Sequence, residues 1–228
     1  MGPLEESAVE DEEARRAKIV RIPCKPCAAE VEEHNTTHLP FRDWCEICVR
    51  GRAQEDPHTS QQSDSAPPGV PVVSWDYAFP RDHVHEAGEP GRPVLVQVDR
   101  ITKYVFADQV QKKGEDAFAS ERANQNLVRI LGYNRAYVKT DQEPSITALV
   151  DQVKRLNRVE IIPEEAVDGD SQSNGDVESA VKRVEGMIRT IKIALEKRIL
   201  AEIPEDHPII PWLIRHSASL LNKYSVGK

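Results

Sequence analysis

Short apolar runs alternate with amphipathic stretches along the chain from Val70 onward. Five runs rich in β-branched residues have the length and composition of strands, at 70–79, 93–99, 104–110, 135–141 and 159–163. Four longer stretches repeat their apolar residues at helical spacing, at 114–132, 144–157, 176–200 and 207–224. Because three strands are followed by alternating helices and strands, the pattern predicts an α/β domain with a mixed five-stranded sheet flanked by helices.

The chain before this domain has a different character. Residues 1–20 are acidic and poor in apolar residues, which predicts a disordered tail. Residues 21–58 contain all four cysteines, and we interpret them as a small metal-binding module. Residues 59–69 are rich in Ser, Gln and Pro, as is typical of a linker. The globular domain then spans 70–228, and we expect it to be incomplete at its C-terminal end.

Length and charge narrow the classes of function. The chain has 228 residues, which is enough for one domain of ordinary size and a small module. No apolar run approaches the ~20 residues that cross a bilayer, and the N-terminus lacks an apolar signal core, so we expect an intracellular protein with no membrane partner. The net charge of −8 argues against a basic coat protein for nucleic acid. It is compatible with an enzyme that grips nucleic acid through a local patch, and residues 175–228 carry 9 basic against 7 acidic groups.

One candidate for metal binding lies in the segment HNTTHLPFRDWCEIC. His34 and His38 are four positions apart, and Cys45 and Cys48 form a C-x2-C pair. Two imidazoles and two thiolates suit a closed tetrahedral zinc site. In a reducing compartment, these cysteines are better interpreted as metal ligands than as disulfide partners.

A second C-x2-C pair leaves an alternative open. Cys24 and Cys27 could join Cys45 and Cys48 in a four-cysteine zinc ribbon, because the spacing between the two pairs fits that motif as well. The third possibility is that one pair is incidental and that no metal binds.

Three acids near the ends of predicted elements form the second candidate. Asp76 lies within an apolar strand, Asp141 ends another, and Glu178 falls in the first turn of the longest helix. An acid inside an apolar strand is costly to bury unless it is paired or binds a cation, and hard oxygen ligands suit magnesium or manganese. The alternative for each residue is ordinary: Asp141 as a turn or helix-capping residue, and Glu178 as a first-turn acid paired with Lys182.

Four other acids are candidates for the same site. Asp99 follows a strand and Asp108 lies within one, and either is interpreted as a structural turn residue or a solvent-facing charge. Glu143 and Asp151 have the positions of helix-surface charges.

The order of an HHCC-like element, a linker, WDYAF, KTDQEPSI and SNGDVESAVKRVEG resembles the integrases of retroviruses and long-terminal-repeat retrotransposons, above all the copia-like ones. The resemblance covers roughly residues 34–228 and implies a ribonuclease-H-like core with an aspartate, aspartate, glutamate triad. That triad corresponds here to Asp76, Asp141 and Glu178. Lys182 matches a lysine with which the family contacts DNA, whereas Glu185 stands where a second basic residue is usual.

The resemblance implies a retrotransposon polynucleotidyl transferase, carried in a polyprotein, that uses two Mg2+ or Mn2+ ions. It would process the 3′ ends of element DNA and transfer them into target DNA, as a homo-oligomer acting in the nucleus and otherwise cytoplasmic. Candidate phosphate contacts on the long helix are Lys182, Arg183, Arg189 and Lys192, unless this is simply a solvated helix face. The alternative function is an inactive or domesticated protein that binds zinc or nucleic acid without catalysis.

Overall fold

The computed structural model describes residues 26–52, 69–80, 91–141, 143–165 and 175–225. The acidic tail predicted at 1–20 and nearly all of the linker predicted at 59–69 lie outside the described residues. The boundaries of these two segments therefore stay predictions.

Five strands form one mixed sheet in the order β3-β2-β1-β4-β5. Strand β1 pairs antiparallel with β2 and parallel with β4, while β2–β3 is antiparallel and β4–β5 is parallel. The strands are β1 Val72–Ala78, β2 Val94–Asp99, β3 Val105–Gln109, β4 Arg135–Thr140 and β5 Glu160–Glu165. This arrangement confirms the predicted α/β fold with a mixed five-stranded sheet flanked by helices.

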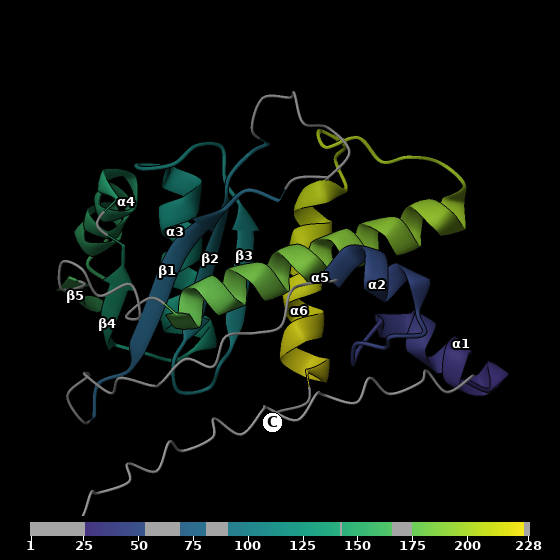
Figure 1. The fold of residues 1–228 in the computed structure, drawn as a ribbon. Coiled ribbons are helices and arrows are strands. Elements are labelled where there is room, and N and C mark those ends of the chain that lie inside the picture. Colours follow the sequence, from purple (N-terminus) through teal and green to yellow (C-terminus); the bar gives the residue numbers. More distant parts are fainter. Residues whose placement is uncertain (1–25, 53–68, 81–90, 142, 166–174, 226–228) are drawn as a thin grey trace, which may run out of the picture.

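The helices divide between the two faces of the sheet and the N-terminal module (Figure 1). They are α1 Ala28–Thr37, α2 Glu46–Arg52, α3 Ala117–Gln125, α4 Pro144–Arg155, α5 Gly175–Ile199 and α6 Ile210–Tyr224, and α3 continues as the π-helix Asn126–Ile130. Among the described helices, none combines the length and apolarity needed to cross a membrane. All four predicted helices of the globular domain are present, with ends shifted by a few residues.

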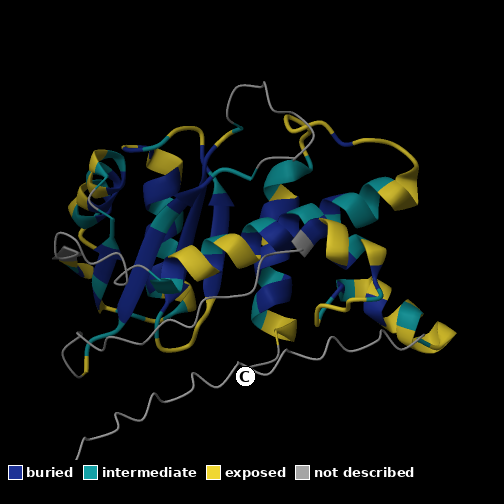
Figure 2. Cartoon of the chain, viewed as in Figure 1, coloured by how far each residue is buried: buried dark blue, intermediate teal, exposed yellow. Residues whose placement is uncertain are grey.

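Two hydrophobic cores lie on opposite faces of the sheet (Figure 2). One core contains apolar residues of α3 and α4 together with Trp75 and Tyr77 of β1. The other contains apolar residues of α5 and α6 together with Ala78 of β1. Because successive side chains of a strand point to opposite faces, Asp76 lies on the α5 face.

Coverage of both faces explains why the strands have continuous apolar sequences rather than alternating ones. All six residues of β2 are buried, as are six of the seven residues of β1. The exception in β1 is Asp76, which is partly exposed. Asp76 is therefore the one residue of β1 and β2 that is not buried.

Candidate functional site

Four side chains of the N-terminal module meet at one buried point, and they are His34, His38, Cys45 and Cys48. Their candidate ligand atoms all lie within 4.8 Å of one another. Sγ of Cys48 lies 3.3 Å from Nε2 of His34, and Sγ of Cys45 lies 3.6 Å from Nδ1 of His38. The N–S edges of a tetrahedral zinc site are about 3.5 Å long when the metal–ligand bonds have ordinary lengths. The predicted grouping is confirmed, and the four residues could hold zinc in a closed site.

Local structure brings these side chains together from two helices. His34 lies in the last turn of α1, and His38 follows the helix in a left-handed conformation with φ 54°. The N–H of His38 donates to the His34 carbonyl at 2.7 Å, which fixes the two residues relative to each other. Cys45 directly precedes α2, and Cys48 lies within it. The site therefore joins α1 to α2.

The structure favours the His2Cys2 set over the four-cysteine alternative. Cys27 is exposed at the start of α1, where its backbone N–H donates to Oε2 of Glu30 at 2.8 Å. It does not belong to the buried cluster of His and Cys side chains. Cys24 lies outside the described residues.

Asp76 and Asp141 come together at the carboxyl ends of β1 and β4. The two strands are parallel, and Trp75 of β1 is in register with Thr140 of β4. Each aspartate follows directly after one of these paired residues. The Oδ1 atom of Asp141 is buried and has no hydrogen-bond partner among the described residues. A buried carboxylate oxygen with no donor is a suitable ligand for a hard cation.

Electrostatics at this pair are unfavourable to a second negative charge. Burial raises the pKa of Asp76 to about 6, and the carboxylate of Asp141 contributes to the increase. The N–H of Tyr77 opposes it, because it donates to Oδ1 of Asp76 at 2.7 Å and stabilises the charged form. Like charges that share a partly buried site favour proton uptake or cation binding.

Two further charged residues belong to the acid site and were missed by sequence reasoning. Lys113, in the β3–α3 loop, lowers the pKa of Asp76, and Glu143, just before α4, raises it. Nζ of Lys113 donates to both carboxylate oxygens of Glu143 at 2.8 Å. The same ammonium lies 5.5 Å and 5.0 Å from the ring centroids of Tyr77 and Phe79. Glu143, predicted as a helix-surface charge, is therefore a paired residue at the edge of the site.

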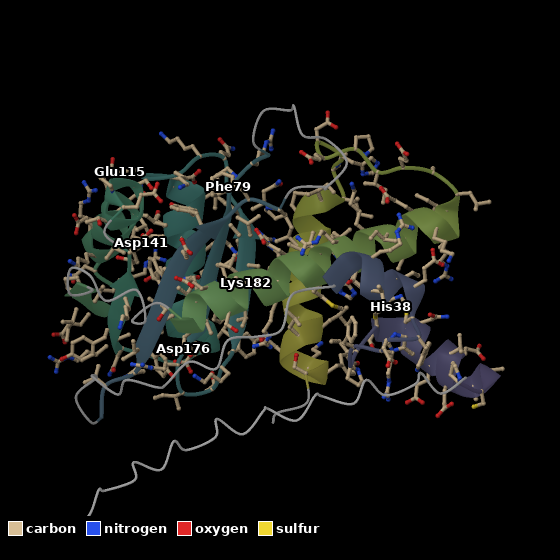
Figure 3. The ribbon with its side chains drawn as sticks, viewed as in Figure 1. His38, Phe79, Glu115, Asp141, Asp176 and Lys182 are labelled. Carbon is tan, nitrogen blue, oxygen red and sulfur yellow. The ribbon has the colours of Figure 1, made fainter. Side chains whose placement is uncertain are left out.

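Glu178 lies apart from this group. It is exposed in the first turn of α5, and it is not among the charged groups that act on Asp76. The start of α5 is held by Asp176, which lies 3.3 Å from both Arg100 and Lys103 after β2. Figure 3 shows Asp176 below Asp141 and Lys182 further along the helix. The role of Glu178 as a third metal ligand stays a prediction.

The contact of Asp176 with Arg100 and Lys103 explains why Glu178 lies apart from Asp76. Residues just after β2 lie at the amino end of β1, because Asp99 is in register with Val73 and the two strands run antiparallel. Asp76 is three positions further along β1, or about 10 Å at the usual rise of a strand. Among the described residues, the His/Cys cluster is the one group of three or more potential ligands close enough to share a metal.

The predicted DNA contacts on α5 have different surroundings. Lys182 and Arg183 are exposed, and a guanidinium N–H of Arg183 donates to the Ser225 hydroxyl at 3.3 Å. Arg189 is partly buried, and its Nε–H donates to the carbonyl of Gly51 in α2 at 3.1 Å. Arg189 is therefore engaged inside the molecule, whereas Lys182 and Arg183 are placed at the surface.

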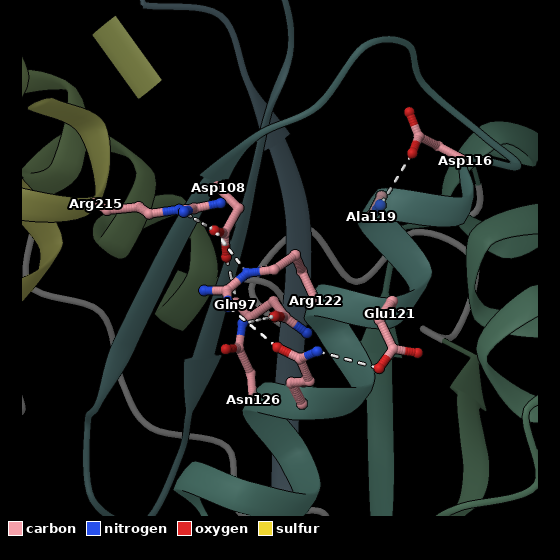
Figure 4. Close-up of polar contacts among 9 residues, drawn as sticks. Gln97, Asp108, Asp116, Ala119, Glu121, Arg122, Asn126 and Arg215 are labelled. Carbon is pink, nitrogen blue, oxygen red and sulfur yellow. Dashed lines mark hydrogen bonds and ion pairs between the residues drawn. The ribbon is translucent and has the colours of Figure 1, made fainter. Parts of the chain in front are cut away.

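Two of the acids that sequence reasoning set aside, Asp99 and Asp108, have structural roles. Asp99 is buried and accepts hydrogen bonds from both the N–H and the hydroxyl of Thr102, at 2.8 and 2.6 Å. Asp108 is buried and pairs with Arg122 and Arg215 at 3.1 and 2.7 Å (Figure 4). The solvent-facing alternative is wrong for both aspartates.

Comparisons with known proteins give only distant structural similarity. No protein-family model matches the chain, and no curated protein matches it. The catalytic core domain of BIV integrase is 14% identical, with a TM-score of 0.43 over 69% of this chain and 86% of that one. A chain of the simian T-cell lymphotropic virus intasome in complex with PP2A regulatory subunit B56 gamma is 16% identical, with a TM-score of 0.48. That match covers 87% of this chain and 62% of the intasome chain.

Proposed function

We propose that the chain is a polynucleotidyl transferase of a retrotransposon, which processes the 3′ ends of element DNA and joins them to target DNA. The observation that carries the proposal is the Asp76–Asp141 pair at the carboxyl ends of two adjacent parallel strands. The motifs WDYAF, KTDQEPSI and SNGDVES, which resemble those of integrases, support the same function.

The residues of the acid site fit a divalent cation of the magnesium type. Asp76 and Asp141 offer hard oxygen ligands, and the buried Oδ1 of Asp141 has no hydrogen-bond partner in the described structure. A cation of this kind supplies activation of a water or 3′ hydroxyl and neutralises charge on the phosphate under attack. Glu178 would complete the ligand set if the first turn of α5 approached Asp76.

Other residues of the chain would position the DNA. Lys182 and Arg183 are exposed on α5 and are proposed as phosphate contacts. Lys113 sits beside Asp76 on the rings of Tyr77 and Phe79, where its charge partly compensates the acid pair. We also propose self-association and action in the nucleus, both of which follow from the resemblance to integrases.

A second function is favoured by the position of Glu178. Because this residue is exposed and lies outside the group that acts on Asp76, the chain could be an inactive or domesticated derivative that binds zinc and nucleic acid. The two functions make opposite predictions for metal-dependent cleavage.

The test is a strand-transfer assay with the full zinc-loaded chain, Mg2+ or Mn2+, a supercoiled plasmid and labelled duplexes with blunt or recessed 3′ ends. The proposed transferase joins the recessed duplex to the plasmid, whereas a plain nuclease of the same fold cuts without joining. Asp141→Asn should reduce joining at least about 100-fold, because one shared ligand is lost. Asp151→Asn, an exposed carboxylate of α4, should retain full activity.

Two outcomes would contradict the proposal. Joining that survives Asp141→Asn would place the chemistry elsewhere. DNA binding without cleavage or joining in either metal would support the non-catalytic alternative.

A further inference from the structure

Helix α2 of the N-terminal module lies directly against the C-terminal half of α5. The contact is closest at Gly51, where a Cβ atom would lie 2.3 Å from Oγ1 of Thr190. The same Cβ would lie 2.8 Å from the backbone N and Cα of Thr190. No side chain fits in this space, so glycine is required for the close approach of the two helix backbones.

Polar contacts fix the direction of α2 on α5. The carbonyl of Gly51 is in the last turn of α2, where it lacks a partner within the helix, and Nε–H of Arg189 donates to it at 3.1 Å. A cation at this end of a helix is also favoured by the helix dipole. At the other end of α2, Glu46 pairs with Lys197 at 3.2 Å. The two helices are therefore antiparallel.

The same short helix and the residue before it provide the two cysteines of the His/Cys cluster. Cys48 lies three residues before Gly51, and Cys45 directly precedes the helix. A helix of 7 residues is marginal by itself in water. Its position therefore depends on two attachments, the metal-ligand cluster on one side and α5 on the other.

Helix α5 connects this contact to the sheet. In its N-terminal half, Val177, Ala180 and Val184 belong to the core against the sheet, and Glu178 lies on the same turns. Thr190 is 12 residues beyond Glu178, or about 18 Å along the helix axis at the usual rise. Figure 1 shows one continuous helix that crosses the sheet and reaches α2.

We propose that the zinc module is a brace for α5. Zinc bound by the four ligands holds α2 in place, and α2 holds the C-terminal half of the helix that carries Glu178. In this proposal the module stabilises the globular domain through direct contact and is not merely attached to it by the chain. The proposal needs zinc binding, but it does not need the chain to be a catalyst.

The test is hydrogen–deuterium exchange of the full chain, read by mass spectrometry, with zinc bound and after removal with a zinc-selective chelator. We expect the amides of α5 from Ile188 onward to exchange at least about tenfold faster without zinc, because α2 no longer packs against this part of the helix. The amides of β2 lie in the middle of the sheet and should keep their protection. Zinc content is measured in the same samples.

The variant Gly51→Ala tests the contact between α2 and α5 without removing a zinc ligand. This variant should keep its zinc, since Gly51 is not a ligand, but its α5 amides should exchange as fast as those of the chelated protein. Gly175→Ala is the matched control, because an added Cβ there meets nothing within 4 Å. It should leave exchange beyond Ile188 unchanged.

The comparison of zinc-loaded and chelated native chain keeps the test decisive even if Gly51→Ala does not fold. Unchanged exchange in α5 after zinc removal would overturn the proposal, as would a chain that contains no zinc. Equal loss of protection in β2 would also overturn it, because zinc would then support the whole fold rather than α5. Failure of the strand-transfer assay has no bearing on these readouts.

Discussion

Asp76 and Asp141 each follow one member of the in-register pair Trp75–Thr140, so two carboxylates from distant parts of the chain meet at adjacent strand ends. The negative charge of Asp141 helps raise the pKa of Asp76. The pair is thus held together by sheet pairing in spite of its repulsion. Such an arrangement has a cost in stability, which a bound cation would remove.

The first prediction concerns the charge on Asp76 in the metal-free protein. Its pKa rises from 3.8 to about 6, so the folded state prefers the protonated form. Protonation of Asp76 therefore stabilises the folded state fully below pH 3.8, and this stabilisation is lost as the pH rises through about 6. Asp76→Asn removes the partly buried charge and should increase the free energy of unfolding at pH 7.5 by about 1–2 kcal/mol, because solvent screening reduces the full effect of the pKa shift.

Urea unfolding between pH 4 and 8 in the presence of a chelator measures this effect. The native chain should lose stability between pH 4 and 7 relative to Asp76→Asn. Asp151→Asn, which changes an exposed carboxylate, should follow the native chain. A variant at Asp76 that is less stable than the native chain at pH 7.5 would contradict the prediction.

The second prediction concerns Lys113, whose charge lowers the pKa of Asp76. Lys113→Gln removes that charge, so the pKa of Asp76 should increase further above its value in the native chain. The pKa of Glu143 should also increase, because its bidentate contact with Lys113 is the main cause of its low pKa. Carboxyl-carbon NMR titration measures both groups directly.

Lys112→Gln is the matched control, since its side chain is exposed and the residue is the immediate neighbour of Lys113. It should leave both titrations unchanged. An unchanged pKa of Asp76 in Lys113→Gln would show that Lys113 does not belong to the acid site.

The third prediction concerns metal binding by the N-terminal module. Cys48→Ser removes a ligand whose Sγ lies 3.3 Å from His34 and should abolish stoichiometric zinc binding. Cys27→Ser should retain about one zinc per chain, because Cys27 is exposed and outside the cluster. Elemental analysis after gel filtration measures zinc content, and loss of zinc in Cys27→Ser would revive the four-cysteine alternative.

The fourth prediction concerns the buried carboxylate of Asp108, on which Arg122 and Arg215 converge. Asp108→Asn leaves two guanidinium groups without their shared counter-charge, and it should lower the free energy of unfolding by about 3 kcal/mol. Glu121→Gln is the control, because it breaks a more exposed pair with Arg158 and should therefore cost much less stability. Denaturant midpoints compare the variants, and equal losses would contradict the prediction.

Much of the fold follows from local sequence. Apolar runs and helical spacing placed all five strands and the four helices of the globular domain, since both faces of the sheet are covered and its strands are continuously apolar. The His/Cys cluster was also predictable, because its four ligands lie within one short segment. The sequence singled out Asp76 and Asp141, but their pairing depends on the order and parallel direction of β1 and β4, which the sheet topology sets.

Tertiary packing alone decided the remaining features of the site. The contact of Lys113 with Glu143, and that of Gly51 with Thr190, join residues with no shared motif or spacing. The distance of Glu178 from the acid pair depends on how the start of α5 is held by residues after β2. Sequence patterns record the local preferences of backbone and side chain, whereas these contacts depend on how whole elements pack, which no short segment encodes.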